Sequence, residues 1–235
     1  MTGLVEAATA ILSASERRLA AVSANISNVS TPGYKRQISF ASLVSRDRAD
    51  MIGGLVMRLR PDLAQGKMVD TGNPLDIAIS GDGFFKLRDG NAMVYSRQGQ
   101  FQLGANGAVV TPQGQVLQQA GGGDLVLEHA GVEILADGTV LDGDRPVARV
   151  GVFQASAGAI EAIDGSLFRL GTGEAEEVAD PLVRQGMTEA SNVSVGDEMV
   201  TMMAALRQAE SGARLVQTYD DLLGRAITTF GQSGR

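Results

Sequence analysis

Apolar residues near the N-terminus recur at the spacing of an amphipathic helix. Their steps combine threes and fours, which places them on one helical face: Leu4, Ala8, Ile11, Leu19, Val22, Ile26 and Val29. The pattern stops where Asn28 and Ser30 favour turns, Pro32 pushes Thr31 out of the α region, and Gly33 allows an unrestricted φ. The sequence predicts a helix that ends near Asn28.

A longer helical pattern occupies the C-terminal end of the chain. Its positions alternate steps of three and four over about four and a half heptads, and only Asp220 interrupts the apolar stripe. The apolar members are Met199, Met202, Leu206, Ala209, Ala213, Val216, Leu223, Ile227 and Phe230. Ser194 and Asp197 form a capping-box pattern at its start. Gly212 and Gly224 weaken a helix unless a neighbouring element approaches closely, so we interpret both as contact points.

Between these helices, apolar and polar residues alternate in short runs that are bounded by Gly, Asp, Asn or Pro. The runs are NPLDIAISGDGFFKLRDG, MVYSRQGQFQL, GAVVTPQGQVL, VEILADGTVL and PVARVGVF. Alternation with a period of two between turn residues is typical of strands. The sequence therefore predicts an α+β protein in which a central all-β module separates two long terminal helices.

These patterns divide the chain into four parts. We expect an N-terminal helix over 1–35, an extended connector over 36–70, a central β-rich module over 71–182 and a C-terminal helix over 183–235. The connector is predicted to hold one strand at Gly54–Arg60. The acidic stretch from Glu174 to Asp180, before Pro181, is interpreted as the linker that returns to the last helix.

Composition narrows the classes of partner and of site. A formal net charge of −7 and no basic cluster longer than a pair argue against nucleic-acid binding. The absence of cysteine excludes disulfides, thiolate nucleophiles and zinc–thiolate sites. No apolar run approaches the roughly 18 to 20 residues that span a bilayer, and the N-terminus lacks the pattern of a cleaved leader. We expect no membrane insertion, and export would need a specialised route.

Candidate chemistry is sparse. His129 is the only histidine, and we interpret it as a turn or strand-end residue rather than a base. Asp137-Gly138 and Asp142-Gly143-Asp144 lack the remaining ligands of a calcium loop and are predicted to be hairpin turns. Gly81-Asp82-Gly83 is likewise predicted to be a tight turn, and the methionines of the C-terminal stripe are interpreted as packing residues. We expect no enzyme activity, no catalytic residue, no metal and no cofactor, although a site made of Ser, Asp or Glu side chains stays open.

Three stretches resemble motifs of the axial proteins of the bacterial flagellum, the rod and hook subunits. They are SANISNVSTPGY (23–34), GNPLDIAISGDGFF (72–85) with YSRQGQF (95–101), and EASNVSVGDEMV (189–200). The positions that carry the resemblance are Asn25, Asn28, Thr31, Pro32, Gly33, Tyr34, Asn73, Pro74, Leu75, Asp76, Gly81, Gly83, Phe84, Phe85, Ser191, Asn192 and Val193. The motifs occur in the family's order along most of the chain.

The resemblance implies a structural subunit of the basal-body rod. In this family the two terminal segments pair as a coiled coil that lines a tubular polymer, and the β module faces outward. The implied shaft transmits torque, and the implied partners are copies of the chain, other rod subunits and the flagellar type III export apparatus. The expected location is the periplasmic rod, reached without a cleaved signal peptide. The short connector and compact module resemble the proximal rod subunits most.

Burial of the helix stripes in that polymer makes them the expected assembly interface. Its residues are Leu4, Ile11, Leu19, Val22, Ile26, Met199, Met202, Leu206, Val216, Leu223 and Ile227. Two alternatives stay open from the sequence. The chain could be a distal rod or other axial subunit, or a soluble binding module whose termini form a helical hairpin.

Overall fold

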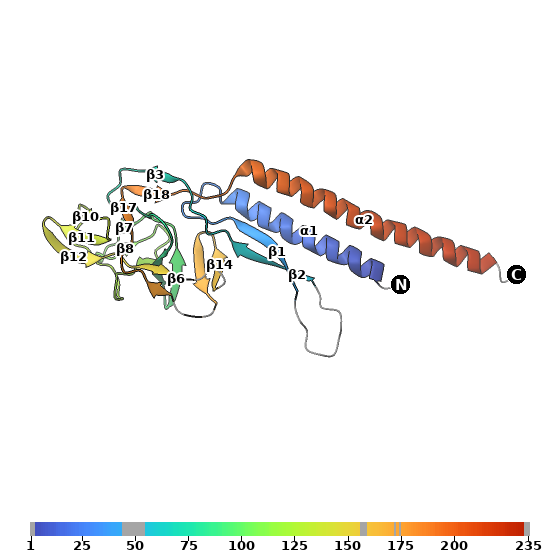
Figure 1. The fold of residues 1–235 in the computed structure, drawn as a ribbon, viewed down its shortest axis with the longest axis horizontal. Helices are drawn as coiled ribbons and strands as arrows, with labels where there is room; N and C mark the ends of the chain where they lie inside the picture. Colours follow the sequence, from blue (N-terminus) through green and yellow to red (C-terminus); the bar gives the residue numbers. More distant parts are fainter. Residues whose placement is uncertain (1–2, 44–54, 156–158, 172, 174, 233–235) are drawn as a thin grey trace. The chain divides into compact units, whose positions relative to one another are not determined.

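The computed structural model describes residues 3–43, 55–155, 159–171, 173 and 175–232 (Figure 1). The chain divides into two compact units. Unit 1 comprises Met1–Ile26, Gln37–Arg60 and Ser194–Arg235, and unit 2 comprises Ser27–Arg36 and Pro61–Val193. Each unit is therefore built from segments that lie far apart in the sequence.

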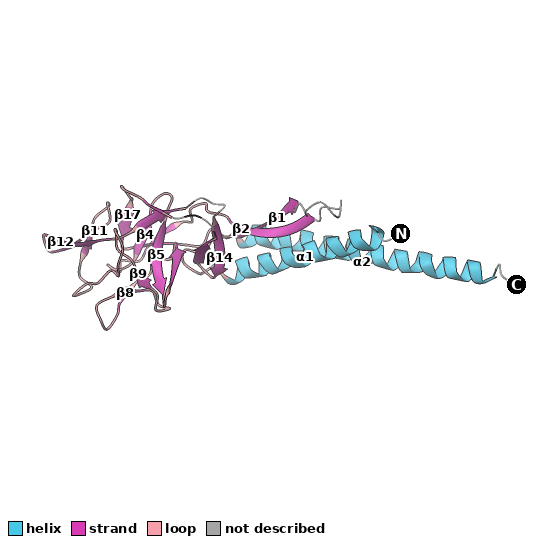
Figure 2. Cartoon of the chain, turned by 90° about the horizontal axis from the view of Figure 1, so that it is seen from below, coloured by secondary structure: helices cyan, strands magenta, loops and turns pink. Residues whose placement is uncertain are grey.

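Two helices dominate unit 1, and a helix is present at each end of the chain as predicted. Both are shorter than the predicted 1–35 and 183–235, because the chain turns after Ser27 and because residues 183–185 and 187–189 form strands. Helix α1 spans Gly3–Ser27, and helix α2 spans Val195–Gln232, directly after the predicted cap residue Ser194. The helices lie side by side in both views (Figures 1 and 2). They run antiparallel, because Arg18 donates a hydrogen bond to Gln208 at 3.1 Å while Gly212, further along α2, contacts Ile11, earlier in α1. Neither described helix combines the length and apolar character needed to cross a bilayer.

Small residues bring the two helices together. Ala205 is fully buried on α2, and Gly212 lies seven residues, about two turns, further on. A Cβ placed on Gly212 would lie 3.1 Å from Cγ2 of Ile11 and 3.2 Å from Cγ of Leu12, which confirms Gly212 as a contact point. Among the residues that the structure describes, no atom of a neighbouring element lies within 4 Å of such a Cβ on Gly224, so the prediction that it is also a contact point is wrong for this part of the chain.

Two strands complete unit 1. Strand β1 (Gln37–Leu43) pairs with β2 (Leu55–Pro61) in a two-stranded sheet. Strand β2 confirms the strand predicted at Gly54–Arg60, whereas β1 was not predicted. The Arg60 guanidinium lies 4.9 Å from the centre of the Phe40 ring and links the two strands by a cation–π contact.

Unit 2 is built of strands, as predicted for the central module. Its largest sheet has the order β14-β15-β6-β5-β9-β8-β7, with β13 pairing both β5 and β16, and all its pairs are antiparallel. The bounds are β5 (Phe84–Asp89), β6 (Ala92–Ser96), β7 (Gln102–Leu103), β8 (Val109–Val110), β9 (Val116–Leu117), β13 (Val152–Gln154), β14 (Ile160–Asp164), β15 (Leu167–Leu170) and β16 (Glu176–Glu177).

Three smaller sheets flank the large one. They have the orders β10-β11-β12, β4-β17 and β3-β18. The bounds are β3 (Met68–Asp70), β4 (Ile77–Ile79), β10 (Glu133–Ile134), β11 (Thr139–Asp142), β12 (Arg145–Arg149), β17 (Val183–Gln185) and β18 (Met187–Glu189). All five predicted runs contain strands. The acidic stretch predicted to be a linker is in part a strand, because β16 gains a partner in β13.

Two adjacent phenylalanines set the layers of unit 2. Because side chains alternate along a strand, Phe84 and Phe85 of β5 point to opposite faces of the large sheet. Phe85 packs edge-on against Phe101 at 5.5 Å within the main apolar core, while Phe84 packs edge-on against Phe168 at 5.6 Å in a smaller second core. Gly81 and Gly83, with φ of 96° and 127°, form the tight turn that was predicted before this strand.

The two helix glycines should respond differently to alanine. Gly224→Ala should raise the thermal midpoint of the helices, because alanine favours a helix by about 1 kcal/mol and the site is open. Gly212→Ala should not raise it, because its Cβ would crowd Ile11 and Leu12. Thermal unfolding of the monomer by far-ultraviolet circular dichroism measures both. Equal stabilisation by the two substitutions would contradict a close helix contact at Gly212.

Candidate functional site

A buried carboxylate joins three separate segments of unit 2. Glu189, at the end of β18, accepts a hydrogen bond from Nζ of Lys35 at 2.6 Å and from a guanidinium nitrogen of Arg97 at 3.2 Å. The backbone N–H of Gly66 donates to the same Glu189 oxygen as Lys35, at 2.7 Å. Glu189, Lys35 and Arg97 are at most 3% exposed. We call Lys35, Arg97 and Glu189 the charge cluster.

The environment of the charge cluster opposes its positive charges. Burial lowers the pKa of Lys35 below its ordinary value, and the facing carboxylate of Glu189 works against that shift. Burial likewise lowers the pKa of Arg97, whose guanidinium also donates to the carbonyl of Gly81 at 2.6 Å and lies 5.4 Å from the centre of the Phe84 ring. The two cations therefore depend on Glu189 as their buried counter-charge.

Asn192 holds the same region through backbone groups. Its side-chain oxygen accepts the N–H of Arg36 at 2.7 Å, and its side-chain nitrogen donates to the carbonyls of Asp62 and Ala64, each at 2.9 Å. The Lys35 ammonium also donates to the carbonyl of Ala64, at 2.7 Å. The Asn192 amide thus holds Arg36, just after the first motif, against Asp62 and Ala64 at the start of the 61–193 part of unit 2.

Position 33 requires glycine for two reasons, its backbone conformation and the lack of room for a Cβ. Its φ is +70°, which is unfavourable for residues with a Cβ. A Cβ at this position would overlap the backbone of Arg97 and Gln98. The N–H of Gly33 donates to the carbonyl of Glu189 at 2.7 Å, so the turn in the first motif packs directly against the charge cluster.

The second motif forms an Asx-type turn ahead of β4. The side-chain oxygen of Asn73 accepts the N–H of Leu75 at 3.3 Å, and its nitrogen donates to the buried Asp76 carboxylate at 3.0 Å. The Asp76 carbonyl accepts the N–H of Gly186 at 2.7 Å. This turn links β4 to the loop between β17 and β18.

A second buried polar group lies in unit 1. Asn25 of α1 and Glu198 of α2 are each 1% exposed, and Nδ2 of Asn25 donates to Oε2 of Glu198 at 3.1 Å. The Asn25 amide also bonds both backbone groups of Gln37: Oδ1 accepts its N–H at 2.8 Å, and Nδ2 donates to its carbonyl at 3.0 Å. Asn25 therefore ties α1 to α2 and to the start of β1.

The structure distributes the predicted interface residues over two kinds of surface. Val22 is buried, and Ile11, Leu19, Ile26, Met202 and Val216 are half-buried in unit 1. By contrast, Met199 is 55% exposed, Leu206 47% and Leu223 37%. Leu4 and Ile227 lie within the helices, but their side chains fall outside the part that the structure describes. The predicted stripe thus splits between intrachain packing and the exposed surface.

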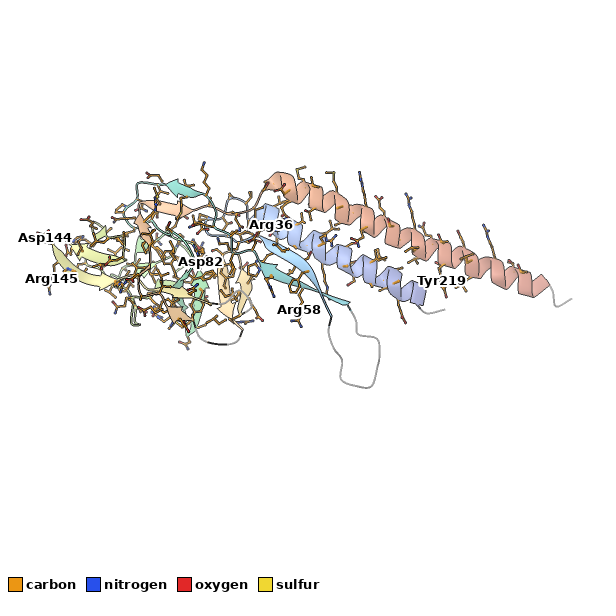
Figure 3. The ribbon with its side chains drawn as sticks, viewed as in Figure 1. Arg36, Arg58, Asp82, Asp144, Arg145 and Tyr219 are labelled. Carbon is orange, nitrogen blue, oxygen red and sulfur yellow. The ribbon has the colours of Figure 1, made fainter. Side chains whose placement is uncertain are left out.

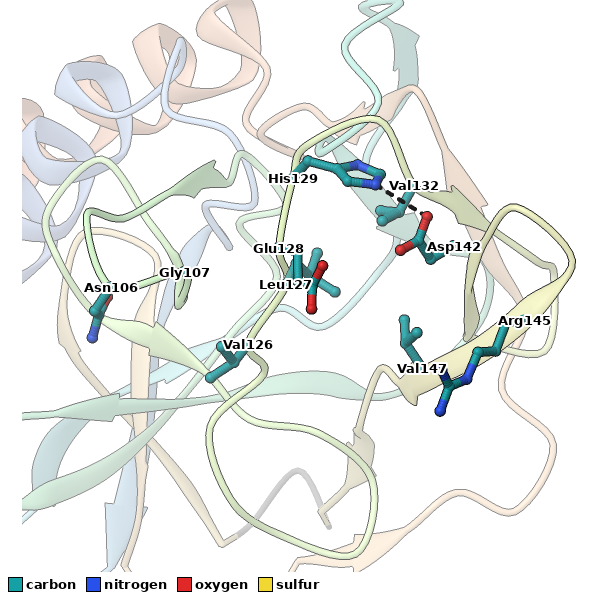
Figure 4. Close-up of a pocket in the computed structure, with 10 residues that line it drawn as sticks. All are labelled: Asn106, Gly107, Val126, Leu127, Glu128, His129, Val132, Asp142, Arg145 and Val147. Carbon is teal, nitrogen blue, oxygen red and sulfur yellow. Dashed lines mark hydrogen bonds and ion pairs between the residues drawn. The ribbon is translucent and has the colours of Figure 1, made fainter.

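A groove in unit 2 contains the only histidine of the chain (Figure 4). The groove has a volume of about 670 Å³, and Nε2 of His129 lies 3.0 Å from Oδ1 of Asp142 across it. His129 lies in a loop before β10 rather than in a turn or at a strand end, and the ten described lining residues include no hydroxyl or thiol. Among those residues, the imidazole–carboxylate pair therefore has no side-chain nucleophile to activate.

Arg88 and Asp124 form a bidentate ion pair on the surface of the large sheet. The Arg88 guanidinium donates to both carboxylate oxygens, at 2.9 and 2.5 Å, and Gln118 donates to one of them at 2.7 Å. These hydrogen bonds hold the pKa of Asp124 at about 2, below its ordinary value of 3.8. The pair joins β5 to the loop that follows β9.

Sequence reasoning did not select the members of the charge cluster. Lys35 directly follows the first motif, Arg97 lies inside YSRQGQF, and Glu189 opens the third motif. Each of the three charged residues lies in or next to a motif and looks like an ordinary surface residue on its own. The signal that could have linked Lys35, Arg97 and Glu189 is their opposite charges, because each occurs in or next to a motif that is otherwise apolar or turn-forming.

Three family models match successive parts of the chain. The model "Flagella basal body rod protein" matches residues 7–35. "Flagellar hook protein FlgE/F/G D1 domain" matches residues 78–141, and "Flagellar basal body rod FlgEFG protein C-terminal" matches residues 184–229. The matches cover α1 with its exit turn, a central part of unit 2, and most of α2, which defines the class as rod and hook proteins of the flagellum.

Relatives extend this similarity over nearly the whole chain. The chain is 31% identical to the flagellar basal-body rod protein FlgF of Caulobacter vibrioides, over 92% of this chain and 93% of the relative. It is 33% identical to FlgF of Salmonella typhimurium (91% and 92%) and 30% identical to the rod protein FlgG of Borreliella burgdorferi (92% and 94%). The chain belongs to the family of flagellar basal-body rod proteins, which confirms the predicted resemblance. It is a structural rod subunit.

Removing the negative charge of the cluster should destabilise unit 2. Glu189→Gln keeps the side-chain shape but removes the carboxylate that pairs with the buried Lys35 and Arg97, so we expect a loss of about 3–5 kcal/mol. Glu161→Gln is the control, because its partner Arg169 is 64% exposed and the loss should stay below about 0.5 kcal/mol. Urea unfolding followed by circular dichroism measures both. Similar midpoints for the two variants would refute the role given to Glu189.

The Arg88–Asp124 pair should make stability depend on acid pH. The pKa of Asp124 is lower in the folded state, so the pair stabilises above about pH 4, and this contribution is lost as the pH falls towards 2. Asp124→Asn should therefore cost less than about 1 kcal/mol at neutral pH, since both side chains are a third exposed, and nothing near pH 2.

Urea midpoints at several pH values test this difference. Asp144→Asn, at the exposed β11–β12 turn where Figure 3 labels Asp144, is the control for the loss of one surface carboxylate. A constant difference between wild type and Asp124→Asn across the acid range would contradict the assignment.

Proposed function

We propose that this rod subunit assembles through its α1–α2 pair, which acts as a coiled coil, into the tubular shaft that transmits torque through the basal body. The observation that carries this proposal is the distribution of apolar side chains on α2. One face of that helix packs on α1, and further apolar side chains remain exposed on both sides of that face.

The two exposed flanks of α2 have different members. Met199, Met203 and Leu206 follow at steps of four and three, so they share one flank. Val200, Leu215 and Leu222 lie on the opposite flank. Their exposed fractions range from 38% to 62%. A helix that is apolar on several sides is stable in water only when other elements cover it, which supports contacts with at least two neighbouring subunits.

The length of α2 supports the same assembly. With 38 residues against the 25 of α1, α2 is about 57 Å long and α1 about 38 Å. Because the helices are antiparallel, the last turns of α2 extend past the N-terminal end of α1 (Figures 1 and 2). This extension carries Leu222 and Leu223, and contact with another copy would cover it. Contacts between unlike surfaces of successive subunits propagate rather than close, as a shaft requires.

The predicted interface residues have two roles in this proposal. Ile11, Leu19, Val22, Met202 and Val216 hold the helix pair together, and Met199, Leu206 and Leu223 bind neighbours. Leu4, Ile26 and Ile227 belong to the same proposed interface. Tyr219, which Figure 3 labels on α2, is half-buried and extends the face that packs on α1.

The proposed setting is the periplasmic rod of the flagellar basal body. The partners are further copies and other rod subunits, as the names of the relatives suggest. Delivery by the flagellar type III apparatus without a cleaved signal peptide is part of the proposal. We assign the proximal type because of the short connector. The similarity to FlgG makes a distal rod subunit the second candidate, and locating the chain within isolated basal bodies distinguishes the two.

A charge on the exposed flank should block assembly without unfolding the monomer. Leu206→Asp is expected to leave urea unfolding of the monomer nearly unchanged, because Leu206 is 47% exposed there. In the rod a buried unpaired carboxylate would be strongly unfavourable, so swimming and recovery of the chain in basal bodies should fall by at least about tenfold.

Arg214→Asp is the matched control for this experiment. Arg214 is exposed, and its neighbours three and four residues away on α2 are polar (Glu210, Ser211, Gln217 and Thr218), so a carboxylate there disturbs neither apolar flank. Normal incorporation of the Leu206→Asp variant into basal bodies would contradict the proposed interface. Equal loss in both variants would show sensitivity of the whole helix rather than of one flank.

A further inference from the structure

The flank of α2 that carries Met199 and Leu206 also carries a carboxylate. Met199, Leu206, Ala213 and Asp220 recur every seven residues, so they share one side of the helix, and all four are exposed. Asp220 is also the residue that interrupts the apolar stripe in the sequence. A neighbouring subunit that covers this flank as far as Asp220 would therefore bury a negative charge.

The described part of the chain does not neutralise Asp220. Its neighbours three and four residues away on α2 are not basic: Val216, Gln217, Leu223 and Gly224. Among the described residues, its carboxylate has no hydrogen-bond or ion-pair partner. Burial of a carboxylate is strongly unfavourable unless a cation pairs with it. The surface that covers this flank must therefore supply a cation beside apolar side chains.

One face of the two-stranded sheet β1–β2 offers this combination. The Arg60 guanidinium lies 4.9 Å from the centre of the Phe40 ring, so these two side chains share a face. Because side chains alternate along a strand, Ile38 lies on the same face as Phe40, and Arg58 lies on the same face as Arg60. Ile38 is 42% exposed, and both arginines are exposed. We call Ile38, Phe40, Arg58 and Arg60 the basic face.

The two arginines of the basic face differ in what they contact. Arg60 lies against the Phe40 ring, whereas no described carboxylate pairs with Arg58, which Figure 3 labels. By contrast, Arg88 and Arg169 on the surface of unit 2 each pair with a carboxylate of the same chain. The Arg58 guanidinium therefore keeps its donors available for a carboxylate of another molecule.

We propose that the basic face of one copy covers the Asp220 end of this flank on the next copy. Arg58 pairs with Asp220, and Ile38 and Phe40 cover Leu223, which is 37% exposed beside it. A second copy is the favoured occupant because the two surfaces match in charge and in apolar character. The surfaces are unlike, so the contact repeats from copy to copy rather than closing a two-fold dimer. The inference rests on the proposed assembly through α2 and names the surface that covers one of its flanks.

Exchanging the two charges tests this pair in cells that carry only the variant chain. Arg58→Glu or Asp220→Arg alone places like charges opposite each other, so recovery of the chain in basal bodies should fall at least about fivefold. The chain with both substitutions restores opposite charges at every contact, and its recovery should return to within about twofold of wild type. Circular dichroism of each monomer should show unchanged helix content, because both side chains are exposed.

Arg145→Glu combined with Asp220→Arg is the matched control. Arg145 is exposed on β12 of unit 2, outside the basic face, so the pair of substitutions makes the same change in net charge and should not restore recovery (Figure 3). Equal restoration by this control would show a general effect of charge and would overturn the pairing. Normal recovery of either Arg58→Glu or Asp220→Arg would also overturn it, as would a charge-exchanged chain that stays as impaired as the single variants.

Neutral variants replace the reversed charges if a monomer loses helix content. Arg58→Gln and Asp220→Asn should each lower recovery, and the double variant should be no worse than the more impaired single variant, because both substitutions remove the same pair. Losses that multiply would contradict the pairing. If Leu206→Asp blocks assembly while the exchanged charges fail to restore it, assembly through α2 stands and only the contact with the basic face is refuted.

Discussion

The buried carboxylate of Glu189 is the constraint on which the architecture of unit 2 depends. It neutralises Lys35 and Arg97 at 2.6 and 3.2 Å and accepts the N–H of Gly66, so three segments far apart in sequence meet at one side chain. Two buried cations are stable only while an anion is held in place between them. The exit turn at Gly33 packs on this group through the Glu189 carbonyl, and the N-terminal motif is thereby fixed to the strand that precedes the last helix.

Helix α2 shows how a single sequence pattern can serve two surfaces. Its heptad stripe is wider than α1 can cover, since small residues such as Ala205 and Gly212 let the helices approach closely and bury little apolar area. Larger residues, Met199 and Leu206 among them, remain on the flank. A monomer with tight intrachain contacts and apolar flanks can stay folded and still associate with further copies.

Local patterns were sufficient to predict much of the fold. Both helices, β2 and the strands within the five alternating runs follow from periodicity, and the turn at Gly81 and Gly83 follows from glycine. Strands β1, β3 and β14 to β18 were missed because they lie outside those alternating runs. Strand β16 consists of two glutamates whose pairing with β13 is a tertiary effect, so composition alone suggested a linker.

The polar clusters could not be predicted, because their partners are brought together by tertiary structure. Lys35 and Glu189 are separated by 154 residues, and Asn25 and Glu198 by 173. In the sequence each is one hydrophilic residue within or next to a motif, and hydrophilic residues are normally exposed. The motifs are informative for a physical reason. Gly33, Asn25 and Asn192 occupy positions where a Cβ would overlap backbone or where one amide must satisfy several backbone groups, so few other residues fit. A motif in this chain therefore marks where segments join, and the charged or amide residue inside it identifies the group that holds the joint.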